Sequence, residues 1–156
     1  GSTHYHSMET PNSYLDFRNK INVTSGMKAT FIAEENSEDA WGYANNLIKN
    51  VSEDDINFLK LDVGKYESQN QKRQEALHNY SKTNLEIYPN IWTGYGLLRG
   101  GGITAMVGNY EEVANLIKQF YDNGLDKLLI AATPEIYFLN HFIDGVMPIL
   151  KQYEMI

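Results

Sequence analysis

The sequence predicts an α/β fold of about four β/α units with parallel strands, which is about half of a (β/α)8 TIM barrel. Strand patterns alternate with helix patterns along the chain, as expected for parallel strands joined by right-handed crossovers. The segment Leu128–Ala132 is continuously apolar, which is typical of a strand buried on both faces. A complete barrel needs about 250 residues, and this chain has 156. We therefore expect one partial barrel domain over residues 1–156.

The N-terminal segment is expected to hold the first strand and the first helix. Residues 1–8 are interpreted as a tag remnant followed by a strand around Thr3–His6, because the chain opens with Gly1 and not with methionine. A helix is expected to begin near Pro11, since proline fits the first helical turn.

Met27–Ala33 has the alternation of the next strand. Its two faces are predicted to carry Met27, Ala29, Phe31 and Ala33 on one side and Lys28, Thr30 and Ile32 on the other. Asn36–Asp39 is a helix start with a capping side chain and acidic residues in the first turn. Helices are also expected over Glu53–Leu61 and Ser68–His78.

The last part of the chain contains two further strands and two helices. A short strand is expected over Thr104–Val107, followed by a helix that Asn109 and Glu112 begin as a capping box. Gly124 is expected to end this helix in the left-handed conformation. After Leu128–Ala132, a final helix is predicted to end or kink at Pro148.

Residues 79–104 are predicted to form a glycine-rich mobile lid. The stretch Asn84–Gly108 holds six glycines, and Arg99 is its only basic residue. Long loops inside a compact domain are usually lids, binding loops or disordered segments, and the aromatic residues here argue against disorder. A mobile surface connection is the alternative. The lid interpretation predicts closure over an anionic ligand with Arg99 as the charge.

The composition predicts a globular protein that binds neither nucleic acid nor a membrane. Hydrophobic residues make up 42% of the chain, which excludes a disordered composition. The net charge of −7 argues against a nucleic-acid backbone as the partner. No apolar run is long enough to span a membrane, and no signal peptide is visible. The absence of cysteine excludes disulfides and is compatible with the cytoplasmic location that we expect.

The histidines do not predict a metal site. His4 and His6 would face the same side of a strand, a spacing that can bind a metal ion. Because both lie near a chain end, where segments commonly fray, we expect no bound metal there. His78 and His141 are expected to be structural residues, with His141 packed or half-exposed on the last helix.

The glycine-rich stretch contains the pattern N-L-E-I-x-P-N-x-W-x-G-x-G-L-x-R-G-G, followed by T-A-x-V-G. This pattern resembles the mobile-loop region of the alkanesulfonate monooxygenases, flavin-dependent enzymes of the bacterial-luciferase-like superfamily. Further similar segments are Glu38–Trp41, Gln71–His78 and Asn123–Asp126. The resemblance covers roughly residues 8–150 and implies strand five through helix eight, the C-terminal half of the family's barrel.

Arg99 is the leading candidate for a catalytic and cofactor-binding residue. Its guanidinium offers a planar fork for sulfonate, phosphate or carboxylate, and a surface ion pair is the alternative. The resemblance implies that Arg99 belongs to the loop that closes over flavin and substrate. Gly100 and Gly101 are predicted cofactor contacts, because glycines let backbone N–H groups approach a ligand closely.

The resemblance also implies catalytic positions at Lys28, Thr30 and Thr133. The family normally has arginine, histidine and tyrosine there, respectively. The change to Lys28 loses a bidentate contact, and the change to Thr30 loses a group that titrates near neutral pH. Thr133 also fits a helix N-cap before Pro134.

The resemblance implies a fragment of a reduced-FMN-dependent monooxygenase that oxygenates an alkanesulfonate-like substrate to aldehyde and sulfite. Reduced FMN would be a co-substrate delivered by an NAD(P)H-dependent flavin reductase, with no metal. Half a barrel leaves two open strand edges, so we expect self-association or pairing with a missing N-terminal half, and no activity of this chain alone. The alternative, favoured by Lys28, Thr30 and Thr133, is a non-catalytic remnant or interaction domain.

Overall fold

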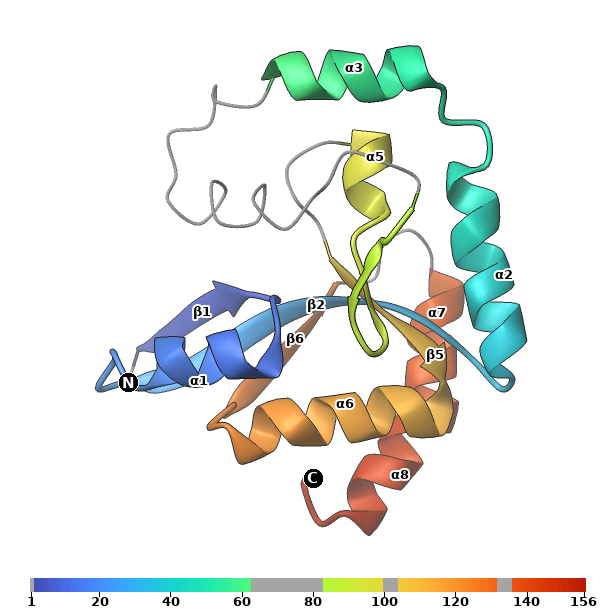
Figure 1. Cartoon of the computed structure of the whole chain (residues 1–156). Coiled ribbons are helices and arrows are strands. Elements are labelled where there is room, and N and C mark those ends of the chain that lie inside the picture. Colours follow the sequence, from blue (N-terminus) through green and yellow to red (C-terminus); the bar gives the residue numbers. More distant parts are fainter. Residues whose placement is uncertain (1, 63–82, 100–103, 132–135) are drawn as a thin grey trace.

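The computed structural model describes residues 2–62, 83–99, 104–131 and 136–156, in which a mixed sheet curls into an open half-barrel with helices around it (Figure 1). The strands are β1 (Thr3–Ser7), β2 (Thr24–Glu34), β3 (Glu86–Tyr88), β4 (Ile91–Trp92), β5 (Ala105–Asn109) and β6 (Lys127–Ala131). The helices are α1 (Pro11–Arg18), α2 (Ser37–Ile48), α3 (Glu53–Asp62), α5 (Tyr95–Arg99), α6 (Tyr110–Asp122), α7 (Ile136–His141), the π-helix η1 (Phe142–Val146) and α8 (Met147–Gln152). None of these helices is long and apolar enough to cross a lipid bilayer. The helix expected over Ser68–His78 lies outside the described residues.

The long strand β2 is the centre of the sheet and pairs with three parallel strands. β1 pairs with Thr24–Lys28 and β5 pairs with Thr30–Glu34, so their registers on β2 do not overlap. β6 pairs with Gly26–Thr30 and overlaps both registers. Because a strand accepts one neighbour at a time on each side, β1 and β5 follow each other along one side of β2, and β6 lies along the other.

The prediction of the C-terminal half of a (β/α)8 barrel, with four parallel β/α units, is wrong. The hairpin of β3 and β4 joins the sheet in antiparallel orientation, with Ile91 opposite Met106 and Trp92 opposite Ala105. In a barrel each strand pairs with its neighbours along the chain, whereas β6 pairs with β2 instead of β5. The alternation of strand and helix patterns predicts the elements but does not determine which strands pair.

Local capping signals predict the starts of α1 and α6 correctly. The side chain of Thr10 accepts a hydrogen bond from the Ser13 N–H, and Pro11 occupies the first turn of α1. At the start of α6, Asn109 and Glu112 form a reciprocal capping box. Gly124 follows α6 with a φ of 102°, a conformation that glycine adopts without a Cβ penalty.

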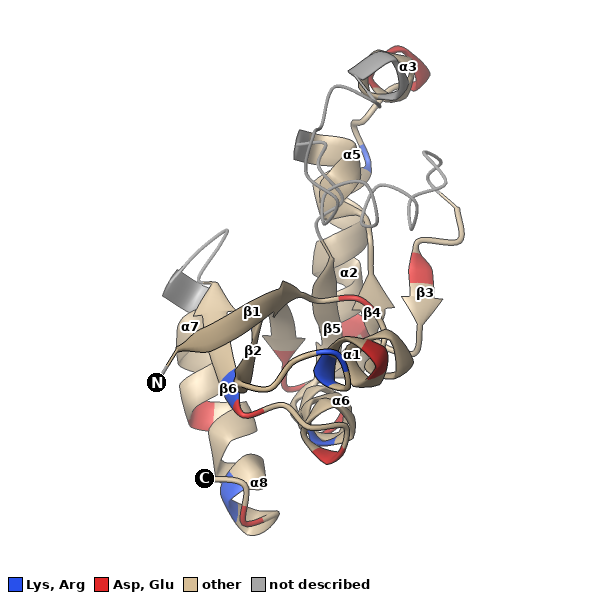
Figure 2. Ribbon diagram, turned by 90° about the vertical axis from the view of Figure 1, so that its left-hand side faces the viewer, with Lys and Arg blue, Asp and Glu red and all other residues tan. Residues whose placement is uncertain are grey.

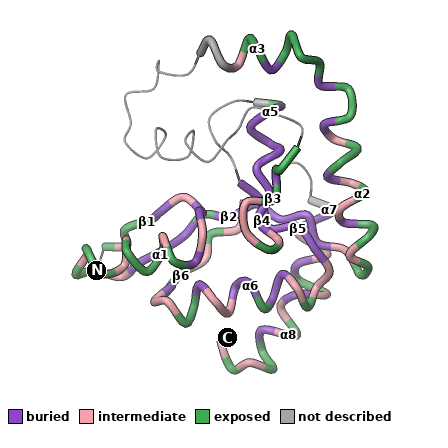
Figure 3. The backbone as a smooth tube through the Cα atoms, in the orientation of Figure 1, coloured by how far each residue is buried: buried purple, intermediate pink, exposed green. Residues whose placement is uncertain are grey.

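Two hydrophobic clusters cover the two faces of the C-terminal half of β2, and Figure 3 shows that this part of the strand is mostly buried. Phe31 belongs to the cluster that contains residues of α6, η1 and α8. Ile32 belongs to the cluster that contains residues of α2 together with Trp92 and Tyr95. The predicted alternation of Met27–Ala33 is therefore confirmed, because its two sets of side chains point to opposite layers. The final helix does not end at Pro148 but continues through the π-helical turn of η1 into α8.

Candidate functional site

Beside the N-terminal half of β2, no described element covers one face of the sheet, and we call this surface the open face. It consists of two residues from each of three neighbouring strands, β1, β2 and β6: Tyr5, Ser7, Gly26, Lys28, Lys127 and Leu129. Side chains alternate along each strand, so the residues between these, such as Met27, point to the helices on the other face. Tyr5 and Leu129 are 48% and 49% exposed. The prediction that Leu128–Ala132 is buried on both faces is therefore wrong.

Gly26 makes room for contacts across the open face. A Cβ atom at Gly26 would lie 2.5 Å from the Tyr5 ring, so the ring crosses β2 where the strand has no side chain. Lys127 reaches over β2 from the other side, and its Nζ donates to Thr3 Oγ1 at 3.1 Å. Thr3 and Lys127 belong to the strands on either side of β2. An aromatic ring and an ammonium group thus meet on the same uncovered surface.

The open face is positively charged although the whole chain carries a net charge of −7. Lys28 and Lys127 are diagonal neighbours on adjacent strands, and none of the six open-face residues is acidic. Figure 2 shows a β1 ribbon without charged residues and a basic segment at the start of β6. Local cations attract an anion even on an acidic protein. The open face can therefore hold an anionic group beside exposed aromatic and aliphatic side chains.

A buried hydrogen-bond network fixes β2 and β6 under the open face. Tyr14 Oη donates to Ser25 Oγ, and Ser25 Oγ donates to the Gly124 carbonyl, both at 2.7 Å. The Ser25 N–H donates to Asp126 Oδ2 at 2.8 Å. Burial raises the pKa of Tyr14, against the lowering effect of its bond to Ser25. Tyr14 therefore stays a neutral donor near pH 7, and the network gives the site a rigid support.

The structure brings together only two of the residues that the sequence predicts for the site. Lys28 is exposed on the open face, and Thr30 is buried two residues further along β2. Arg99 ends the short helix α5, and its side chain is outside the described part. Gly100, Gly101 and Thr133 also lie outside the described residues. Their roles in binding or catalysis stay predictions.

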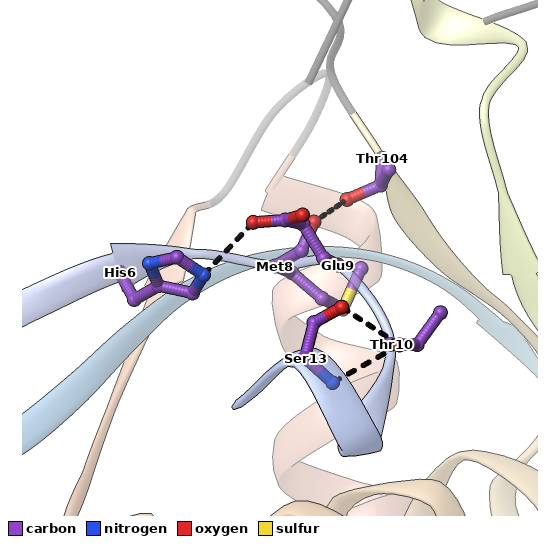
Figure 4. A network of polar contacts seen from close by, with 6 residues as sticks. All are labelled: His6, Met8, Glu9, Thr10, Ser13 and Thr104. Atoms are coloured by element: carbon purple, nitrogen blue, oxygen red, sulfur yellow. Dashed lines mark hydrogen bonds and ion pairs between the residues drawn. The ribbon is translucent and has the colours of Figure 1, made fainter. Parts of the chain in front are cut away.

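Three strand ends converge beside Thr30. Thr30 is paired with Ala105 at the start of β5 and with Ala131 at the end of β6, while β1 ends at Ser7, opposite Lys28. Thr104, just before β5, donates from Oγ1 to the Met8 carbonyl at 2.7 Å, which joins the end of β1 to the start of β5 (Figure 4). Ligands of open α/β sheets bind outside the carboxyl ends of strands, and β1 and β6 both have their carboxyl ends here.

A buried histidine–glutamate pair lies next to this convergence. His6 Nε2 is 2.9 Å from Glu9 Oε2, and both side chains are buried (Figure 4). The His6 ring stacks on Phe17 at 4.4 Å, and His4 contacts the same ring edge-on. The two histidines do share one face as predicted, but that face packs on α1. No cluster that could hold a metal ion is found among the described residues.

A second polar cluster lies at the carboxyl ends of β2 and β5. Tyr110 Oη is 2.5 Å from His141 Nδ1, and His141 Nε2 is 3.9 Å from Glu34 Oε2. His141 therefore lies between a phenol and a carboxylate, in hydrogen-bond contact with Tyr110 and at a longer distance from Glu34. His141 is half-buried, as expected. Sequence reasoning missed the cluster, because the partners are 31 residues or more apart and no local spacing links them.

Much of the predicted lid is packed into the core. The β3–β4 hairpin turns at Asn90, whose φ is 71°, and residues 91–97 are all buried. Trp92 and Tyr95 pack edge to face at 5.3 Å within the cluster around Ile32. The stretch from Ile91 to Leu97 therefore supports the sheet. Closure of residues 79–104 as a lid stays a prediction.

Comparison with known proteins gives a fold and no family. No protein-family model matches the sequence. A crystal structure of riboflavin lyase with modified FMN and its substrate riboflavin is similar, with a TM-score of 0.61 and 15% sequence identity. The match covers 99% of this chain and 39% of the riboflavin lyase chain. At this identity the similarity shows the fold alone, and this chain spans well under half of the protein it matches.

The resemblance to the alkanesulfonate monooxygenases and the luciferase-like superfamily is not supported and is corrected here. No family model matches, the similar solved structure is described as a riboflavin lyase, and the sheet is not that of a TIM barrel. The motif around Trp92 and Tyr95 has a different explanation in this fold. Its aromatic residues fill the core beside Ile32, and its Pro89-Asn90 pair forms a hairpin turn.

Proposed function

We propose that this chain is a flavin-binding part of a flavin-dependent enzyme, and that the open face is its contact with the flavin. The observation that carries the proposal is the open face itself, a basic and aromatic surface beside converging strand ends. The fold similarity to a riboflavin lyase crystallised with modified FMN and riboflavin supports a flavin as the ligand. Because this chain spans 39% of that protein, the enzyme activity belongs to a larger assembly.

The residues of the open face fit the parts of FMN. The half-exposed Tyr5 ring and the Leu129 side chain offer apolar surface to a planar ring system. Lys28 and Lys127 offer ammonium groups to a phosphate. Gly26 leaves room for the Tyr5 ring to lie across β2, so a planar group would stack on this ring. A bound flavin supplies the redox chemistry, and the chain supplies binding and orientation.

The chain alone is proposed to bind flavin weakly and to be inactive. Cofactor sites bury most of the ligand surface, whereas the open face would contact one side of it. The candidates for further contacts with the flavin remain Arg99, Gly100, Gly101 and Thr133. In the sequence, Gly101 lies a few residues before Thr104 and Thr133 lies a few residues after Ala131, and these two neighbours flank the site. The flavin reductase and the sulfonate substrate depended on the corrected resemblance, and we propose neither.

Titration of the chain with FMN and with riboflavin tests this function. Flavin fluorescence anisotropy should show tighter binding of FMN, because only FMN carries the phosphate, and the preference should shrink as salt is added. Lys28→Met should weaken FMN binding by about two- to fivefold, as expected for a solvent-exposed ion pair, and should leave riboflavin binding unchanged. Lys151→Met, on exposed α8, is the matched control. Equal affinity for the two flavins, or equal effects of the two substitutions, would contradict the proposal.

A non-catalytic interaction domain is the second candidate function. The observation that favours it is the exposure of two large apolar side chains, Tyr5 and Leu129, on one face. In this case the chain would bind neither flavin at any concentration used, and its binding partner would be a protein. The same titration therefore separates the two candidates.

A further inference from the structure

A half-open cavity lies on the side of the sheet that faces away from the open face. Its volume is about 260 Å³, whereas an engineered apolar cavity of about 150 Å³ is large enough to bind benzene. Leu128 and Ile130 of β6 line the cavity, and they alternate along the strand with Lys127 and Leu129 of the open face. Figure 1 shows α6 and α8 on the cavity side of the sheet. The two faces of β6 therefore belong to two separate surfaces of the molecule.

Apolar side chains from α6, η1 and α8 form the other walls of this cavity. Ile117 and Tyr121 are four residues apart in α6, so they lie on the same side of that helix. Phe142 of η1 and Leu150 of α8 are buried beside them. Met147, the first residue of α8, is unbranched and can adapt to the shape of a ligand. The cavity is thus suited to an aliphatic group.

The end of α8 turns the chain back onto the cavity. Glu154 has a φ of 60°, and its N–H donates to the Lys151 carbonyl at 3.0 Å. The Met155 N–H donates to the Leu150 carbonyl at 3.1 Å, which completes a Schellman motif. This turn brings Met155 and Ile156 into the lining of the cavity.

Asp126 is the one charged residue among the described residues that line the cavity. Its Oδ2 accepts from the Ser25 N–H at 2.8 Å, which holds the carboxylate at the start of β6. Nearby charges do not neutralise it: Lys118 Nζ is paired with Asp122 at 2.8 Å, and Lys127 donates from Nζ across the open face. A negative charge therefore lies at the border of an apolar cavity.

We propose that this cavity binds a small aliphatic amine, with its alkyl chain against the apolar walls and its ammonium group beside Asp126. Burial of the alkyl chain supplies the affinity, and the carboxylate selects the sign of the head group. A neutral alcohol loses the charge pair, and a fatty acid is repelled by Asp126. The proposal does not depend on flavin binding, because the open face lies on the other side of the sheet, so each proposal can fail without the other.

Calorimetric titration of the chain with octylamine, octanol and octanoate tests this site. The three compounds share one alkyl chain and differ in the charge of the head group at pH 7. Octylamine should bind about two- to fivefold more tightly than octanol, as expected for a solvent-exposed charge pair, and octanoate should bind most weakly. The preference for octylamine should shrink as salt is added. Equal affinities for the three compounds, or no binding of octylamine, would overturn the proposal.

Two variants locate the binding site. Asp126→Asn should lower the affinity for octylamine to that for octanol and leave octanol binding unchanged, since asparagine still offers an oxygen to the Ser25 N–H. Asp122→Asn, which removes the same charge outside the cavity lining, is the matched control. Met155→Trp should abolish binding of both compounds, because the larger side chain fills the cavity. Circular dichroism checks folding, and a folded Met155→Trp variant that binds normally, or equal effects of the two asparagine variants, would contradict the site.

A second copy of the chain is the other occupant that the experiment detects. Sedimentation equilibrium should give the same mass with and without octylamine, because the amine fills a cavity within one chain. A mass that falls when octylamine is added would show that the amine displaces a bound second copy, and this result would also overturn the proposal.

Discussion

The two halves of β2 differ in what covers the same face of the strand. Lys28 and Ile32 are four residues apart and point to the same side of the sheet, yet Lys28 is exposed and Ile32 is fully buried. The face at Ile32 is covered by α2 and by the aromatic residues of the β4–α5 segment. No described element covers the face at Lys28. The comparison teaches that strand alternation sets the direction of a side chain, while its burial depends on the elements that pack there.

The largest difference in stability is expected between alanine variants of the two residues that define this contrast, Ile32 and Lys28. Ile32→Ala is expected to lower the free energy of unfolding by about 2–5 kcal/mol, because it leaves a cavity between α2 and the sheet. Lys28→Ala should change it by less than about 0.5 kcal/mol, as for most surface positions. Urea unfolding followed by tryptophan fluorescence measures the stability of both variants. Similar losses for both variants would mean that the face at Lys28 is covered in solution.

Replacement of a glycine by alanine should also destabilise the covered half of the sheet more than the uncovered half, but the difference should be smaller than for Ile32 and Lys28. At Gly108 in β5, a Cβ atom would lie 2.7 Å from Asn90 Nδ2 and 3.1 Å from Glu112 Cβ. Asn90 cannot move freely, because Nδ2 donates to the Val107 carbonyl at 2.9 Å. Gly108→Ala is therefore expected to cost about 1–3 kcal/mol.

The matched change in the uncovered half is Gly26→Ala. The nearest atoms there belong to the Tyr5 ring, which is half-exposed and can rotate outwards. Gly26→Ala should therefore cost less than about 1 kcal/mol, as for changes that do not overpack a core. The midpoints of thermal unfolding compare the two variants. A larger loss at Gly26 than at Gly108 would show that the Tyr5 ring is held firmly against the sheet.

The smallest expected effect is on the pH dependence of the free energy of unfolding, through Glu112 in the covered half of the sheet. Burial of Glu112 would raise its pKa, but hydrogen bonds with the Asn109 N–H, Ser37 and Asn90 outweigh burial and lower the pKa below its ordinary value. A lowered folded-state pKa gives stability that is present above the unfolded-state pKa of about 4.3. This stability is lost as the pH falls through the folded-state value. Glu112→Gln should cost about 1 kcal/mol at pH 7, and the cost should disappear on acidification.

The neighbouring Glu111 provides the control for this titration. It is exposed in the same first turn of α6, so Glu111→Gln removes the same charge from the same helix end without removing the hydrogen bonds. Its cost should be about 0.3 kcal/mol. Chemical unfolding between pH 3 and 7, a range of about four units around the ordinary glutamate pKa, measures the difference. Parallel pH curves for the two variants would contradict the role assigned to the capping box.

The candidate site could be predicted only in part from the sequence. Alternation in Met27–Ala33 places Lys28 and Thr30 on the face away from the helices that cover Met27, and the structure agrees. It does not reveal that Tyr5 and Lys127 lie beside Lys28, since these residues are more than 20 positions from it and meet through strand pairing. The His6–Glu9 pair has a short spacing, but nothing in that spacing shows that the turn after β1 is buried.

The sequence by itself determined the helix caps at Thr10 and Asn109, the left-handed Gly124 and the two faces of β2. Each of these depends on dihedral preferences and hydrogen bonds within a few residues. Only the tertiary structure decided that β6 pairs with β2, that Leu129 is exposed, and that Trp92 lies in the core. Strand order and burial arise from contacts between residues far apart along the chain, where the free energy of packing outweighs any local preference.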